Sequence, residues 1–250
     1  MSLAYLLLWP THLRNTYEYG CQVTVSPERV VTYRAPLMPP GEVIHQWRSK
    51  RNFAAQHLTN DLPVIRPDTT YFLHGHISVT GGGVYLRIQF LDEDGHTIGN
   101  TILDGTEGHF TMPPEAIDYA IELVNTHHEQ VIFHNLLLMD AATEAAYQFT
   151  VDSFAGSVTA TAKGATQPHV ALVVRQGATK PLLLMPNRDN LVVYVTPYQL
   201  GNIHWIDKIN QELMTFLANY PATSREDSGL AAWQAKLAHW QTLMLREEPK

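Results

Sequence analysis

From Tyr5 to about Asp140, the chain shows short runs in which apolar and polar side chains alternate, separated by clusters of Gly, Pro, Asn and Asp. Alternation with a period of two is typical of β-strands that bury one face, because successive side chains of a strand point to opposite sides. Many short runs with turn signals between them indicate a sandwich or barrel, and not alternating strands and helices. The pattern therefore predicts a mainly β domain.

Two of these runs alternate strictly: YFLHGHISV at 71–79 and VYLRIQFLD at 84–92. The loop between them, Thr-Gly-Gly-Gly at 80–83, has the length and composition of a hairpin turn. If the two runs pair across this loop, His76 lies opposite Arg87 and one sheet face carries a polar and aromatic stripe. The side chains of this stripe are His74, His76, Tyr85, Arg87 and Gln89.

The composition changes at residues 141–146, AATEAA, which we predict as the boundary between a domain at 1–140 and an extension at 141–250. Shorter β runs predict a small β unit at 147–196, and apolar residues at helical spacing predict a helical hairpin at about 199–247. The second helix carries an apolar stripe. This stripe has two possible uses. It packs on the neighbouring helix or the β unit, or it docks into a partner protein through the contacts Trp233, Leu237 and Trp240.

Charge, cysteine content and the distribution of apolar residues indicate which partners and which cellular compartment to expect. Seventeen basic and 24 acidic residues give a net charge of −7, which argues against nucleic acid as a partner. A single cysteine, Cys21, cannot form an internal disulfide, so we expect a reducing cytoplasm. The apolar start MSLAYLLLWP lacks a basic region and a cleavage site, and we expect a buried strand there. No run approaches the roughly 18 apolar residues of a transmembrane segment.

Candidate chemistry is sparse. His74 and His76 place two imidazoles on one strand face, as metal-binding barrels do, but no third ligand follows at the expected spacing. A solvated or ligand-facing surface is the favoured interpretation, and a metal site is the alternative. DEDG at 92–95 lacks the later ligands of a calcium loop and predicts a tight turn. Because neither a nucleophile motif nor a phosphate loop is present, we predict no catalytic residues and no cofactor.

Sugar-binding sandwiches combine flat aromatic rings with Arg, Asn, Gln and His side chains, and this chain offers two such sets. The first is the sheet stripe, with Tyr85, Arg87, Gln89, His74 and His76 as ligand contacts. The second is the loop and strand rim at Trp47, Arg48 and Asn52. For Trp47, the alternative is a buried anchor in the core.

Four segments, in this order, resemble one known family: LMPPGEVIHQWRSKRNF at 37–53, LPVIRPDTTYFLHGHI at 62–77, YLRIQFLDEDGHTIG at 85–99 and YAIELVNTHHEQVIFHNLLL at 119–138. The family is the smallest of the three accessory Sec system proteins of Gram-positive bacteria. The resemblance covers about residues 15–140. It leaves the C-terminal extension unexplained.

The resemblance implies a jelly-roll-like β-sandwich similar to carbohydrate-binding modules, and a protein that is not an enzyme. It implies two companion proteins, one glycosyltransferase-like and one esterase- or acetyltransferase-like, in a cytoplasmic complex that reaches the inner face of the membrane only through its partners. Such a complex serves serine-rich repeat adhesins and a SecA-type ATPase. We therefore expect an adaptor in glycan modification and export of these adhesins. The alternatives are a metal-dependent sugar-modifying enzyme that uses His74 and His76, and a purely structural subunit.

Overall fold

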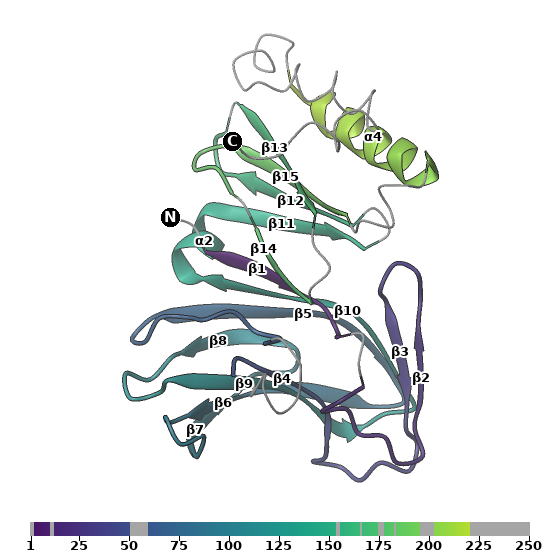
Figure 1. Ribbon diagram of the computed structural model, residues 1–250, viewed down its shortest axis with the longest axis vertical. Helices are drawn as coiled ribbons and strands as arrows, with labels where there is room; N and C mark the ends of the chain where they lie inside the picture. Colours follow the sequence, from purple (N-terminus) through teal and green to yellow (C-terminus); the bar gives the residue numbers. More distant parts are fainter. Residues whose placement is uncertain are drawn as a thin grey trace. The chain divides into compact units, whose positions relative to one another are not determined.

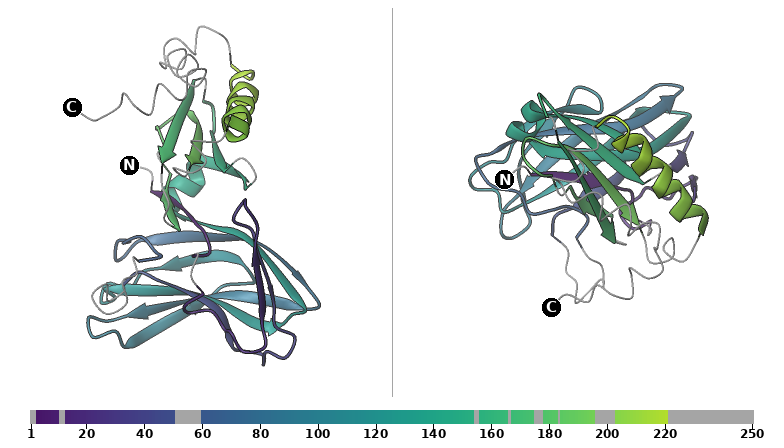
Figure 2. Two further views of the ribbon diagram at one scale, coloured as in Figure 1. Left: turned by 45° about the vertical axis from the view of Figure 1, so that its right-hand side comes forward. Right: turned by 90° about the horizontal axis from the view of Figure 1, so that it is seen from above.

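The computed structural model forms two compact units (Figures 1 and 2). The first contains the described residues of 3–144 and 177–181, and the second contains the described residues of 145–176 and 182–220. The structure describes residues 3–10, 13–50, 60–153, 156–165, 167–174, 178–182, 184–195 and 203–220. Within this part of the chain, no helix is both long and apolar enough to cross a membrane.

The described part of the first unit contains two antiparallel sheets (Figure 1). Sheet A has seven strands: β1 (Ala4–Leu7), β2 (Gln22–Val25), β3 (Val31–Arg34), β5 (Thr70–Thr80), β8 (Glu107–Thr111), β10 (Gln130–Asp140) and β14 (Thr179–Pro181). Sheet B has four strands in the order β4 (Val43–Arg48), β9 (Asp118–His127), β6 (Gly83–Leu91) and β7 (Thr97–Ile102). In sheet A, β10 is central and pairs with β1, β3 and β5.

The core of the first unit lies between the two sheets. Leu73 and Phe133 of sheet A share one buried cluster with Leu86 and Ile121 of sheet B. Each of these side chains has no exposed surface, so their burial is a main source of stability. The predicted mainly β sandwich is therefore confirmed, and so is the predicted division of β5 and β6 into apolar and polar faces.

The predicted hairpin between β5 and β6 is wrong. β5 lies in sheet A, where β10 and β8 occupy its two edges, and β6 lies in sheet B between β9 and β7. The glycine loop thus carries the chain from one sheet to the other. At Gly82, where φ is +152°, an added Cβ would lie 2.1 Å from the His127 carbonyl oxygen, so this crossing requires glycine.

Among its described residues, the second unit contains a small mixed sheet and one long helix, and the short helix α2 (Ala141–Ala146) spans the sequence boundary between the two units. The strands are β11 (Tyr147–Asp152), β12 (Ser157–Ala162), β15 (Asp189–Val195) and β13 (Pro168–Val174). Helix α2 precedes β11, and helix α4 (Ile203–Leu217) buries Leu213 and Leu217 against Leu191. The second predicted helix, with Trp233, Leu237 and Trp240, lies outside the described residues. Strand β14, from the middle of the predicted β unit, pairs with β1 in sheet A.

Candidate functional site

The outer face of sheet B carries a row of hydrogen-bonded polar side chains across three adjacent strands. The register places Arg87 of β6 and Gln46 of β4 on either side of Glu122 of β9. Arg87 Nε donates to Glu122 Oε2 at 2.6 Å, and Gln46 Nε2 donates to Glu122 Oε1 at 2.7 Å. Arg48 Nε donates to Gln46 Oε1 at 2.5 Å. We call Arg48, Gln46, Glu122 and Arg87 the polar ladder.

Glu122 is 3% exposed, although it lies on the face of the sheet that points away from the core. Both of its carboxylate oxygens accept hydrogen bonds from the ladder. A buried carboxylate requires such partners, because removing the charge from water otherwise costs several kcal/mol. Glu122 is therefore the fixed centre of the ladder.

Other polar groups extend this face on both sides of Arg87. Tyr85 and Gln89 lie on the same face of β6 as Arg87, because the residues between them point into the core. Asn100 of the edge strand β7 lies opposite Gln89. The outer face of sheet B thus joins one aromatic ring to amide and guanidinium groups.

The prediction that Trp47 contacts a ligand at the rim is wrong. Its side chain is fully buried, and its indole Nε1 donates to the Leu8 carbonyl oxygen at 3.1 Å. The Trp47 ring stacks on Phe133, with centroids 5.3 Å apart, and leaves no surface for a ligand. The neighbouring Arg48 is exposed on the ladder. Asn52 lies outside the described residues.

The predicted single stripe is also wrong, because His74 and His76 lie on the outer face of sheet A and not beside Arg87. His74 Nδ1 lies 2.7 Å from Glu107 Oε2 of β8. The His76 ring stacks on that of His134, with centroids 4.3 Å apart and planes 15° apart. Burial, with a smaller contribution from His76, holds the pKa of His134 below its ordinary value.

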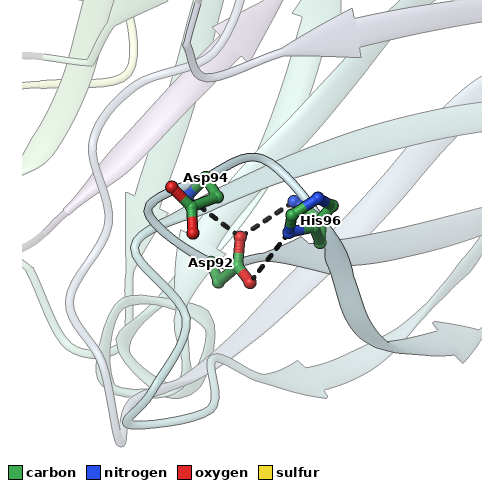
Figure 3. Close-up of side chains that lie close together, drawn as sticks. All are labelled: Asp92, Asp94 and His96. Atoms are coloured by element: carbon green, nitrogen blue, oxygen red, sulfur yellow. Dashed lines mark hydrogen bonds and ion pairs between the residues drawn. The ribbon is translucent and has the colours of Figure 1, made fainter.

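Asp92, Asp94 and His96 form a cluster in the turn between β6 and β7 (Figure 3). Among the described residues, it is the one group of three possible metal ligands that lie within reach of one another, and it does not include His74 or His76. Asp92 Oδ1 accepts from the backbone N–H groups of His96, at 2.8 Å, and Asp94, at 3.0 Å. These bonds, chiefly that from His96, lower the pKa of Asp92. The carboxylate thus closes the tight turn that the sequence predicts.

Sequence reasoning missed Glu122 and Gln46. The one signal for Glu122 is a charged residue inside the otherwise apolar run YAIELV. Its importance depends on which strands lie on either side of β9, and that information is not local.

Comparison with known proteins assigns the chain to a family. A family model described as "Accessory Sec secretory system ASP3" matches residues 16–140, half of the 250-residue chain. The chain belongs to this family. The match covers most of the first unit and includes the whole polar ladder, which confirms the resemblance inferred from the four sequence segments.

Two relatives in this family are named accessory Sec system protein ASP3. The protein from Staphylococcus aureus is 30% identical over 145 residues, which are 58% of this chain and 44% of the relative. The protein from Streptococcus gordonii is 26% identical over 131 residues, which are 52% of this chain and 82% of the relative. The chain thus spans less than half the length of the S. aureus relative.

Two solved structures are similar to this chain. One, of accessory secretory proteins 1, 2 and 3 from Streptococcus pneumoniae, matches with a TM-score of 0.51 and 26% identity over 54% of this chain and 94% of that chain. The other, a glycosylation associate protein complex from Streptococcus agalactiae, has a TM-score of 0.51 and 18% identity over 87% of this chain and 68% of that chain. The second match concerns the fold alone.

Proposed function

We propose that this chain is a non-catalytic adaptor subunit of the accessory Sec complex. The observation that carries the proposal is the match to 94% of one chain in the S. pneumoniae structure of accessory secretory proteins 1, 2 and 3. Its partners are then the two companion accessory Sec proteins, one glycosyltransferase-like and one esterase- or acetyltransferase-like. The complex works in the cytoplasm and delivers serine-rich repeat adhesins to a SecA-type ATPase.

The adaptor contacts the adhesin or its sugars through the outer face of sheet B. Tyr85, Arg87, Gln89 and the exposed Arg48 support this part of the proposal, because they place a ring, an amide and two guanidinium groups on one partly exposed sheet face. Each contact with a repetitive chain is weak. Repetition raises the effective concentration of the next contact, so several weak contacts together hold the adhesin.

Co-purification tests the adaptor function. The full chain, carrying an affinity tag, is co-expressed with the two companion proteins of its own organism, and we expect a complex that stays together in size-exclusion chromatography. We propose the apolar stripe of the C-terminal segment as the partner contact, so a Trp233→Ala, Leu237→Ala, Trp240→Ala variant should lose at least one companion. Tyr85→Ala serves as the control and should retain both. Recovery of the tagged chain without companions would contradict the adaptor role.

Titration with adhesin tests the ligand function. A serine-rich repeat peptide, with and without its sugars, is titrated into the purified complex by calorimetry. We expect saturable binding that Tyr85→Ala and Arg87→Ala weaken without a change in thermal stability. Absence of binding to both peptides would leave a purely structural subunit. An unchanged affinity in both variants would remove the outer face of sheet B from the proposal.

A further inference from the structure

Each of the two guanidinium groups in the polar ladder is held by a hydrogen bond from its own Nε atom. Arg48 uses its Nε for Gln46, and Arg87 uses its Nε for Glu122. Within the described part of the chain, the terminal Nη atoms of both side chains make no hydrogen bond to protein. Each guanidinium therefore has a fixed orientation and a terminal pair of nitrogens available to a ligand.

Glu122 determines both orientations but cannot itself reach a ligand. It is 3% exposed, and both oxygens are already occupied by donors of the ladder. Its Oε2 holds Arg87 directly. Its Oε1 holds the Gln46 amide, which turns the Gln46 oxygen toward Arg48. One buried carboxylate thus orients two guanidinium groups on opposite sides of β9.

The geometry of this pair indicates the chemistry of its ligand. The N–H groups of a guanidinium form a rigid fork that matches two neighbouring oxygen atoms. Such oxygen pairs occur in the adjacent hydroxyl groups of a sugar and in an anion such as phosphate. β4 and β6 are two strand spacings apart, and Arg48 lies two residues along β4 from Gln46, which is in register with Glu122 and Arg87. The two forks therefore originate about 12 Å apart. A ligand that contacts both forks must extend across the strands.

The surroundings favour the sugar over the anion. The Tyr85 ring, with Gln89 and Asn100 on the same face, provides an apolar surface and amide partners for hydroxyl groups. The Glu122 charge compensates one of the two guanidinium charges, which weakens attraction for an anion. We propose that Glu122, directly and through Gln46, is a positioning residue for a site formed by two guanidinium groups. This site binds neighbouring hydroxyl groups of an oligosaccharide, and the inference rests on the proposed function.

A glycan array tests the ligand class. The purified full chain is applied to an array of neutral and acidic oligosaccharides, and the strongest binder is then titrated by calorimetry. We expect a neutral oligosaccharide, with binding that survives an excess of inorganic phosphate. Binding to acidic glycans alone, or competition by phosphate, would overturn the ligand class. Absence of any binder would overturn the site, whereas an intact complex in the co-purification experiment would still support the adaptor function.

The variant Glu122→Gln tests the positioning role. A glutamine has one acceptor oxygen, and its amide nitrogen then faces a donor, so one half of the ladder must separate. We expect at least a tenfold loss of affinity for the selected oligosaccharide, because hydrogen bonds to charged groups are stronger than those between neutral groups. Glu107→Gln, which changes a carboxylate on sheet A, is the matched control and should alter the affinity less than about twofold.

A spectroscopic measurement separates positioning from general destabilisation. In nitrogen-15 NMR spectra, the Nε–H protons of Arg48 and Arg87 should exchange slowly with water in the unmodified chain. In Glu122→Gln, the exchange of at least one of them should accelerate several-fold while the backbone amide spectrum stays dispersed. In Glu107→Gln, both should be unchanged. Equal affinity and equal exchange in the two variants would refute the role of Glu122.

Discussion

Truncation of Trp47 to alanine should strongly destabilise the first unit. The indole is fully buried, and it packs against the Phe133 ring, with centroids 5.3 Å apart, and the Trp9 ring, with centroids 5.8 Å apart. Its Nε1 also donates to the buried carbonyl oxygen of Leu8. Alanine would leave a cavity between the sheets and an acceptor without its donor.

The magnitude follows from these two losses. Removing a buried Trp side chain typically costs about 3–5 kcal/mol. The unpaired Leu8 carbonyl adds about 1 kcal/mol or more. We therefore expect a loss of about 4–6 kcal/mol, which is comparable to the whole stability of a typical domain, about 5–15 kcal/mol. Trp47→Phe keeps an aromatic ring but not the hydrogen bond, and should lose about 1–3 kcal/mol.

Urea unfolding followed by far-ultraviolet circular dichroism measures both variants on the full chain. Tyr19→Ala is a suitable control, because that side chain is 78% exposed and its removal should change the stability by less than about 0.5 kcal/mol. If Trp47→Ala loses less than about 1 kcal/mol and instead weakens binding of the adhesin peptide, the assignment of Trp47 to the core is refuted.

Three further predictions concern the first unit. Gly82→Ala should lower the free energy of unfolding, measured with urea, by at least about 2 kcal/mol, because the added Cβ would lie 2.1 Å from the His127 carbonyl oxygen. An unchanged urea midpoint would argue against the crossing between sheets. Burial and the adjacent His76 lower the pKa of His134, so its protonation opposes folding. The contribution of His134 to stability should therefore be full above about pH 6.5, its ordinary pKa, and be lost as the pH falls below it. His134→Gln should flatten that fall, measured as the difference between urea midpoints on the two sides of this pH. Tyr119→Phe removes a buried 2.9 Å hydrogen bond to a loop carbonyl and should cost about 1–3 kcal/mol, whereas equal stability would contradict that bond.

The candidate site was only partly predictable from the sequence. The two-residue period correctly placed Arg87 on an outer sheet face and Leu86 in the core. The same period cannot distinguish a hairpin from a chain that crosses between two sheets, because both alternate identically. His76 and Arg87 were therefore predicted as neighbours, although they lie on different sheets. The prediction of Trp47 as a rim contact failed for a similar reason. A tryptophan next to charged residues has the same local sequence pattern whether its side chain is buried or exposed.

The sequence by itself determined local properties. These are the alternation of apolar and polar side chains in β5 and β6, the tight turn at Asp92 and the four segments that identify the family. Only the tertiary structure decided which strand edges meet. That choice depends on contacts between segments far apart in the chain, such as Gln46 with Glu122, 76 residues later. Backbone hydrogen bonds form equally well with any strand of suitable length. Burial of the combined apolar faces therefore selected the pairing that built the polar ladder.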